Sequence, residues 1–168
     1  MLKDKLQTDV KEALKSGNAV KRMVLNLVLS AVKSRELEKR TKLSKTESDA
    51  TKLEEVSKLN DEEVVEVLSS EMKKRKDSVE QYTKGGRPEL AEKETREIAI
   101  LIGYMPEQMS EEAVREEVKK AISQTSASGP KDMGKVIGAV MVKIKGKADG
   151  QMVSRLVKEE LQNRLKNA

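Results

Sequence analysis

The chain of 168 residues is long enough for one domain or two small ones, and 38% of its residues are charged while 36% are hydrophobic. It contains no cysteine and no histidine, which excludes disulfide scaffolds, thiolate zinc sites, cysteine nucleophiles and histidine general bases. The formal net charge of +5 is mild, so charge indicates a binding partner only where basic residues cluster along the chain.

Aromatic residues are almost absent from the sequence, in which Tyr82 and Tyr104 are the only two. The core must therefore consist of aliphatic side chains and methionine, and these recur at helical spacing. We expect an all-α protein, with a helical N-terminal domain of about four helices over residues 1–104 and a three-helix tail domain over residues 105–168. No apolar run follows Met1 and no segment reaches the length of a membrane span, so we expect a soluble, cytoplasmic protein.

The first two predicted helices form the centre of the N-terminal domain. Apolar residues at helical spacing predict a first helix that ends at Gly17. Its inner face is expected to comprise Leu2, Leu6, Val10, Ala13 and Leu14. Residues 20–32 are apolar on nearly every side and are expected to form the buried centre of the domain. Residues 41–59 have few strong apolar positions and are expected to form a mobile connector or a loose helix.

Two further helices are expected between residues 60 and 103. Asn60 and Glu63 form a capping box at the start of the third helix, which two glycines at residues 85–86 end. Pro88 occupies the first position of the fourth helix, which continues to about Gly103. A Tyr-Met-Pro sequence then interrupts the helical pattern, because the residue before a proline disfavours the helical region. We place the domain boundary there.

Three helices are expected in the tail domain. Ser110 is placed to cap the first of them, and residues 123–130 form the connector to the second. The second helix is predicted over residues 133–145 and ends at Gly146, after which Asp149 caps the last helix. The buried face of that last helix is predicted to comprise Val153, Leu156, Val157, Leu161 and Leu165.

Basic residues cluster in the tail. Residues 130–168 contain nine Lys or Arg and four Asp or Glu, a net charge of +5, whereas residues 105–129 have a net charge of −2. Gly134 and Gly138 lie on one flank of the predicted second tail helix, where each costs about 1 kcal/mol relative to alanine. These two residues, the glycine flank, indicate either tight packing against a neighbouring helix or an open face on which a sugar–phosphate backbone lies close to peptide groups.

The candidate nucleic-acid contacts combine the glycine flank with the basic residues around it. A phosphate-binding P-loop is excluded, because Lys147 is followed by alanine and no strand is predicted before it. Lysine and arginine bind phosphates without reading sequence, and the tail has no aromatic side chain to stack on bases, which favours folded RNA over single strands. The predicted contacts are Gly134, Lys135, Gly138, Lys143, Lys145, Lys147 and Arg155.

No convincing catalytic constellation is present in the sequence, and we predict no catalytic residue, metal ligand or cofactor. Glu94 and Glu97 lie close to the apolar side of their helix, where a buried acid pair could transfer protons or bind a metal. We expect instead an ion pair with a basic residue such as Arg75 or Arg87. A second basic cluster at residues 73–76 is expected to be a solvated helix face rather than a binding patch, because acidic neighbours neutralise part of it.

Two long segments of the sequence resemble the GatB/YqeY family. They are EMKKRKDSVEQYTKGGRPELAEKETREIAILIGYMPEQMSEEAV, residues 71–114, and DMGKVIGAVMVKIKGKADGQMVSRLVKEEL, residues 132–161. The motifs K-R-K-D-S, G-R-x-x-L-x-x-K-E, Y-x-P-E-Q and M-G-K-V-x-G-x-x-x-x-x-x-K-G-K-A-D-G are specific in combination, and with the leading helices the similarity covers essentially the whole chain. The segment near residues 41–60 departs from the family pattern, since it is longer and more charged.

The resemblance implies an all-helical N-terminal domain and a three-helix tail similar to the C-terminal domain of the GatB component of the tRNA-dependent amidotransferase. Similar domains are appended to some glutaminyl-tRNA synthetases, where they aid tRNA binding. The resemblance thus implies an accessory protein that binds the folded tRNA body, with a synthetase or amidotransferase as a further partner. The family is also associated with carbon–nitrogen ligase activity that uses glutamine as amide donor, but the catalytic domain has no counterpart here. The alternatives are a protein-interaction adaptor and a component of such a ligase.

Overall fold

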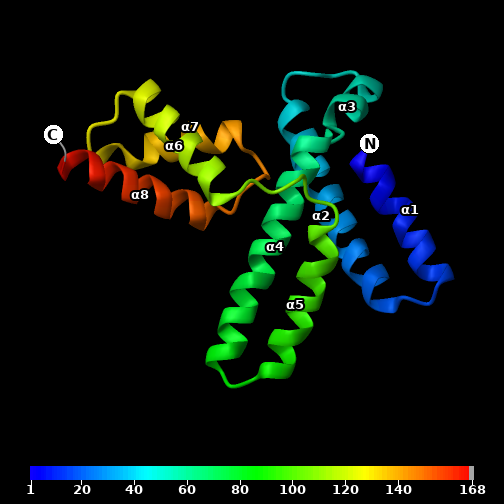
Figure 1. Ribbon diagram of the computed structural model, residues 1–168. Coiled ribbons are helices and arrows are strands. Elements are labelled where there is room, and N and C mark those ends of the chain that lie inside the picture. Colours follow the sequence, from blue (N-terminus) through cyan, green and yellow to red (C-terminus); the bar gives the residue numbers. More distant parts are fainter. Residues whose placement is uncertain (167–168) are drawn as a thin grey trace. The chain divides into compact units, whose positions relative to one another are not determined.

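The computed structural model describes residues 1–166, with side chains through residue 164, and contains no strand in that range (Figure 1). The prediction of an all-α protein is confirmed. The described helices are α1 (Leu2–Lys15), α2 (Ala19–Leu43), α3 (Ala50–Ser57), α4 (Asp61–Lys84), α5 (Pro88–Ile102), α6 (Glu111–Thr125), the short 3-10 helix η1 (Pro130–Asp132), α7 (Met133–Lys143) and α8 (Gly150–Lys166). They form two compact units, an N-terminal unit (Met1–Met105) and a tail unit (Pro106–Ala168).

The N-terminal unit encloses an aliphatic core between α1, α2, α4 and α5. The buried members of this core are Leu6, Val24, Leu25, Val28, Val32, Leu59, Val64, Leu68, Leu101 and Tyr104. The capping box is confirmed at the start of α4, where the backbone N–H of Glu63 donates to Asn60 Oδ1 at 2.9 Å and that of Asn60 donates to Glu63 Oε2 at 2.9 Å. Pro88 begins α5, as its fixed φ favours.

A buried ion pair links α4 to α5. Arg75 is 7% exposed and Glu97 is 4% exposed, and Arg75 Nε donates to Glu97 Oε2 at 3.1 Å. Arg75 also donates to Glu71 Oε2 at 2.9 Å, so two carboxylates compensate its charge. The predicted partnership of Glu97 with a basic residue is confirmed. The prediction that residues 73–76 form a solvated face is wrong for Arg75, because this side chain turns inward.

Two predictions for the first helices are wrong. Leu14, predicted on the inner face of α1, is exposed, and so are Val20, Met23 and Leu27 of the expected buried centre. In α2 the reason is that the helix packs on its unit with the face that carries Val24 and Val28, and Val20, Met23 and Leu27 lie on the opposite, exposed face. In the region 41–59, α2 continues to Leu43 and the short helix α3 follows, which agrees with the helical alternative of the two that were expected.

The tail unit packs α6, α7 and α8 around a second aliphatic core. Its buried members are Val114, Val118, Ala121, Ile122, Ala127, Val136, Val140, Ile144, Val153, Leu156, Val157 and Leu161. The predicted caps are confirmed: Ser110 Oγ accepts from the N–H of Ala113 at 3.2 Å, and Asp149 Oδ1 accepts from the N–H of Gln151 at 2.8 Å. The side chain of Leu165, predicted to be buried, lies outside the described residues.

The second tail helix ends earlier than predicted. Regular α7 stops at Lys143 instead of residue 145, and Ile144 buries its side chain in the core. Gly146 then adopts φ +72°, which glycine tolerates best, and turns the chain toward α8. None of the helices within residues 1–166 is long and apolar enough to cross a membrane.

Candidate nucleic-acid interface

The glycine flank of α7 is open. Gly134 and Gly138 are exposed, and a Cβ atom added at either position meets no atom within 4 Å. Within the tail unit, therefore, no neighbouring helix packs on the flank, and this favours the open face. Val142, one turn further on, is 80% exposed and extends this surface along the helix. Val142 lies four residues after Gly138, which places both residues on one face of the helix, and the sequence-based predictions missed this signal.

Two of the predicted lysines lie beside the glycine flank and lean toward the last turn of α6. Lys135 Nζ donates to the carbonyl oxygen of Thr125 at 3.0 Å, and Lys143 Nζ donates to Gln124 Oε1 at 2.8 Å. Both acceptors are neutral groups, and neither lysine forms an ion pair within the described part of the chain. Their positive charges therefore remain without a bonded carboxylate at the surface.

The basic turn (Lys145, Gly146 and Lys147) is held by the segment that precedes α6. Gln108 Nε2 donates to the carbonyl oxygen of Gly146 at 2.9 Å, and the N–H of Met109 donates to the carbonyl oxygen of Lys147 at 2.8 Å. The backbone of the turn is thus fixed while both lysine side chains are exposed. Sequence reasoning missed the role of Gln108, for which the only signal was its place in the Y-x-P-E-Q motif.

Arg155 of α8 lies in a different environment. Arg155 Nη2 contacts Glu111 Oε2 at 2.6 Å and Arg155 Nη1 contacts Glu159 Oε1 at 3.0 Å, while Arg115 also bridges Glu159. The hydrogen bond from Arg155 holds the pKa of the Glu111 carboxyl below its ordinary value. Glu111 begins α6 and Gln124 stands near its end, about 20 Å away at 1.5 Å per residue. The structure therefore does not bring Arg155 together with Lys135 and Lys143.

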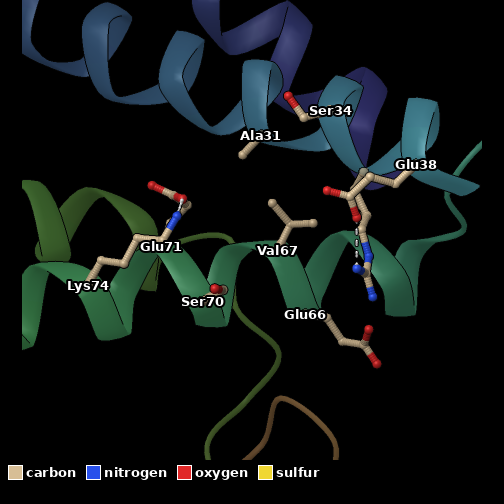
Figure 2. Close-up of a pocket in the computed structure, with 9 residues that line it drawn as sticks. Ala31, Ser34, Glu38, Glu66, Val67, Ser70, Glu71 and Lys74 are labelled. Atoms are coloured by element: carbon tan, nitrogen blue, oxygen red, sulfur yellow. Dashed lines mark hydrogen bonds and ion pairs between the residues drawn. The ribbon is translucent and has the colours of Figure 1, made fainter.

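A groove of 470 Å³ lies between α2 and α4 of the N-terminal unit, and Figure 2 shows the side chains that line it. Its cations have carboxylate partners: Lys74 Nζ lies 2.7 Å from Glu71 Oε1, and Arg35 Nη1 lies 3.2 Å from Glu38 Oε2. Ser70 also lines the groove, and a nearby lysine could in principle act as a base for a serine nucleophile. Lys74 instead forms an ion pair with Glu71. Compared with the lysines of α7, the groove is a poorer site for a phosphate.

The comparison with known families spans both units. The sequence model described as Yqey-like protein matches residues 3–161. The chain belongs to the YqeY-like family. Among curated relatives, this YqeY-like chain is similar to "Altered inheritance of mitochondria protein 41, mitochondrial" of Pyrenophora tritici-repentis, with 29% identity over 158 residues that cover 92% of this chain and 78% of the relative. The protein of the same name from Candida glabrata is 26% identical over 102 residues, 61% of this chain and 48% of the relative.

Proposed function

We propose that this YqeY-like protein binds the folded body of tRNA through its tail unit. The observation that carries the proposal is the open glycine flank bordered by Lys135 and Lys143, whose hydrogen-bond acceptors are neutral. Gly138 costs about 1 kcal/mol relative to alanine in the interior of α7, and Gly134 costs less in its first turn; no contact within the tail unit explains these costs. A ligand backbone that approaches the peptide groups of α7 does explain them, because a Cβ atom at Gly134 or Gly138 would hold that backbone away.

The proposed contacts divide into two groups. Lys135 and Lys143 border the glycine flank, and Lys145 and Lys147 extend the basic surface along the basic turn, where they would bind phosphates by charge. Arg155 is the weakest member of the predicted set, since a phosphate would have to displace a carboxylate from it. The absence of aromatic side chains from the tail favours recognition of RNA by shape and backbone. A cytoplasmic location stays a prediction beside the mitochondrial names of the two relatives.

The test is filter binding of tRNA at several salt concentrations. Binding through phosphates weakens steeply as salt rises, because released counterions drive association. We expect replacement of Lys143, Lys145 and Lys147 by glutamate to abolish binding. The matched control places the same three charge reversals at Lys73, Lys74 and Lys76 of α4, which should leave affinity nearly unchanged. Equal affinity of the wild type and the tail variant would refute the proposal.

A second candidate function, a protein-interaction adaptor, is favoured by Val142. An apolar side chain that is 80% exposed beside two glycines suits a partner helix packed closely on α7, such as one from a synthetase or an amidotransferase. Val142→Lys separates the two functions, since it adds a cation for RNA and removes an apolar contact for a helix. Stronger tRNA binding by this variant supports the first function. Loss of a captured protein partner after nuclease treatment supports the second.

The third alternative is a component of a carbon–nitrogen ligase. It predicts glutamine-dependent conversion of Glu-tRNA when the protein is mixed with an amidase subunit. The titratable groups of the described structure that are most buried, Arg75 and Glu97, neutralise each other inside the α4–α5 hairpin. We therefore favour binding over catalysis, and an assay of Glu-tRNA with glutamine and the amidase subunit tests that preference.

A further inference from the structure

An exposed stripe runs along the whole of α2, on the face opposite the core of the N-terminal unit. Its members recur at alternating spacings of three and four residues, and all are exposed. The stripe consists of Val20, Met23, Leu27, Ser30, Ser34, Leu37 and Thr41. The four large apolar members are exposed by 48%, 41%, 49% and 64% in chain order. Because a helix rises 1.5 Å per residue, the stripe is about 32 Å long.

This spacing is the heptad pattern of a two-stranded coiled coil, in which positions a and d of two helices interlock. Single exposed apolar residues are common on protein surfaces, but a regular row of them on one long helix indicates a contact surface. The buried residues of α2 lie on the other side and satisfy the core of its own unit. A second helix could therefore lie along the stripe without displacing any contact inside the unit.

Charged residues beside the stripe indicate the identity and the orientation of that second helix. With Val20 at position a, Lys33 occupies position g and Glu38 occupies position e of the next heptad. In a parallel pair, these are the positions that face each other across the seam, so two copies of α2 would form two Lys33–Glu38 ion pairs. In an antiparallel pair, position g faces position g, which would bring Lys33 close to Lys33 or Arg40 of the other copy.

Lys33 and Glu38 are available for such pairs. Lys33 is exposed and forms no ion pair within residues 1–166. Glu38 pairs with Arg35, one turn away on the same helix, at 3.2 Å with both side chains more than half exposed. An exposed pair of this kind contributes little to stability and exchanges easily. The groove in Figure 2 borders the stripe at Ser34 and Glu38, so this flank of the stripe is open for a partner side chain.

We propose that the exposed stripe of α2 binds a second copy of this chain in a parallel pair. Val20, Met23 and Leu27 form the first layers of the seam, Ser30 and Ser34 form two polar layers in its middle, and Leu37 and Thr41 form the last two layers. Polar layers lower the stability of a coiled coil, so we expect a weak dimer that dissociates to monomers on dilution. This pairing uses the N-terminal unit and is independent of RNA binding by the tail unit.

The first test is sedimentation equilibrium of the whole chain over a range of concentrations. The wild type should pass from monomer to dimer, and the Met23→Lys/Leu27→Lys variant should raise the dissociation constant about tenfold or more. The control is Leu14→Lys, which replaces an exposed leucine of α1 outside the stripe and should leave the dissociation constant unchanged. A wild type that stays monomeric, or a stripe variant that dimerises as well as the wild type, would overturn the proposal.

The second test addresses the parallel orientation. Lys33→Glu and Glu38→Lys should each weaken the dimer roughly five- to tenfold, and mixing the two variants should restore pairing, because each then meets an opposite charge. The chain has no cysteine, so Val20→Cys and Ser34→Cys can each be oxidised without background. A parallel pair cross-links both variants to themselves. An antiparallel pair cross-links at most one of them, and that result would overturn the orientation.

Discussion

The Gly138→Ala substitution separates the stability of the tail unit from its binding surface. Gly138 lies in the interior of α7 with a negative φ, and a Cβ atom there meets no atom within 4 Å. Alanine therefore gains its helix propensity, about 1 kcal/mol, with no steric cost. For a unit of this size, that gain corresponds to a rise of roughly 4–8 °C in melting temperature, measured by scanning calorimetry.

The same methyl group should lower tRNA affinity. Adding Gly134→Ala extends the row of methyl groups along the glycine flank, with a smaller gain in stability because Gly134 lies in the first turn of α7. We expect the double variant to bind tRNA about tenfold more weakly in a filter assay while melting at a higher temperature. The control is Gly103→Ala in the N-terminal unit, where a Cβ atom would lie 3.5 Å from the carbonyl oxygen of Ile100, an ordinary contact.

Two results would refute this reasoning separately. A lower melting temperature for Gly138→Ala would mean that the glycine flank packs against another part of the folded protein. An unchanged tRNA affinity for the double variant, with a raised melting temperature, would remove the glycine flank from the interface and leave only the lysines as candidates. The Gly103→Ala control should leave tRNA affinity unchanged, which shows that replacing a glycine does not by itself lower the affinity.

Three other predictions concern the buried ion pair of Arg75 and Glu97, the hydrogen bond between Tyr104 and Asp9, and Gln108. Glu97→Leu leaves Arg75 with one carboxylate, so urea unfolding should show a loss of about 3 kcal/mol, and adding Arg75→Met should recover much of it. The hydrogen bond from the Tyr104 hydroxyl holds the pKa of Asp9 below its ordinary value of 3.8. This bond therefore stabilises the folded state above pH 3.8, and its contribution is lost as the pH falls through the pKa of Asp9 in the folded state. Tyr104→Phe should therefore raise the Asp9 pKa in an NMR titration, and its stability deficit should shrink in acid. Gln108→Ala should speed amide exchange in the basic turn with little change in melting temperature.

Two helix starts and the buried ion pair could be predicted from the sequence because their determinants are local or few. The capping box of Asn60 and Glu63 needs only residues three apart, and Ser110 caps α6 for the same reason. Glu97 stands among apolar residues on its helix, and a charge in that position needs a partner. Arg75 and Arg87 were both candidates for that partner, and in the structure it is Arg75 that bonds to Glu97.

The covered face of α2 could not be predicted from the sequence. Val20, Met23 and Leu27 are as apolar as the buried Val24 and Val28, so hydrophobicity does not distinguish the two sides. Which side is buried depends on where α1, α4 and α5 pack, and that is a tertiary choice. The heptad spacing of the exposed side was nevertheless present in the sequence, and it becomes informative only when the structure shows that the row is uncovered.

The tail unit shows why net charge alone does not locate a binding surface. Residues 130–168 have a net charge of +5, which treats Arg155 and Lys143 alike. In the structure Arg155 contacts Glu111 and Glu159, whereas Lys143 donates to a neutral amide oxygen. An incoming phosphate must break bonded ion pairs to reach Arg155, whereas at Lys143 it replaces a hydrogen bond to a neutral group, with Glu117 interacting only through space. This difference between the partners of the two cations supports the proposed site on α7 over one on α8.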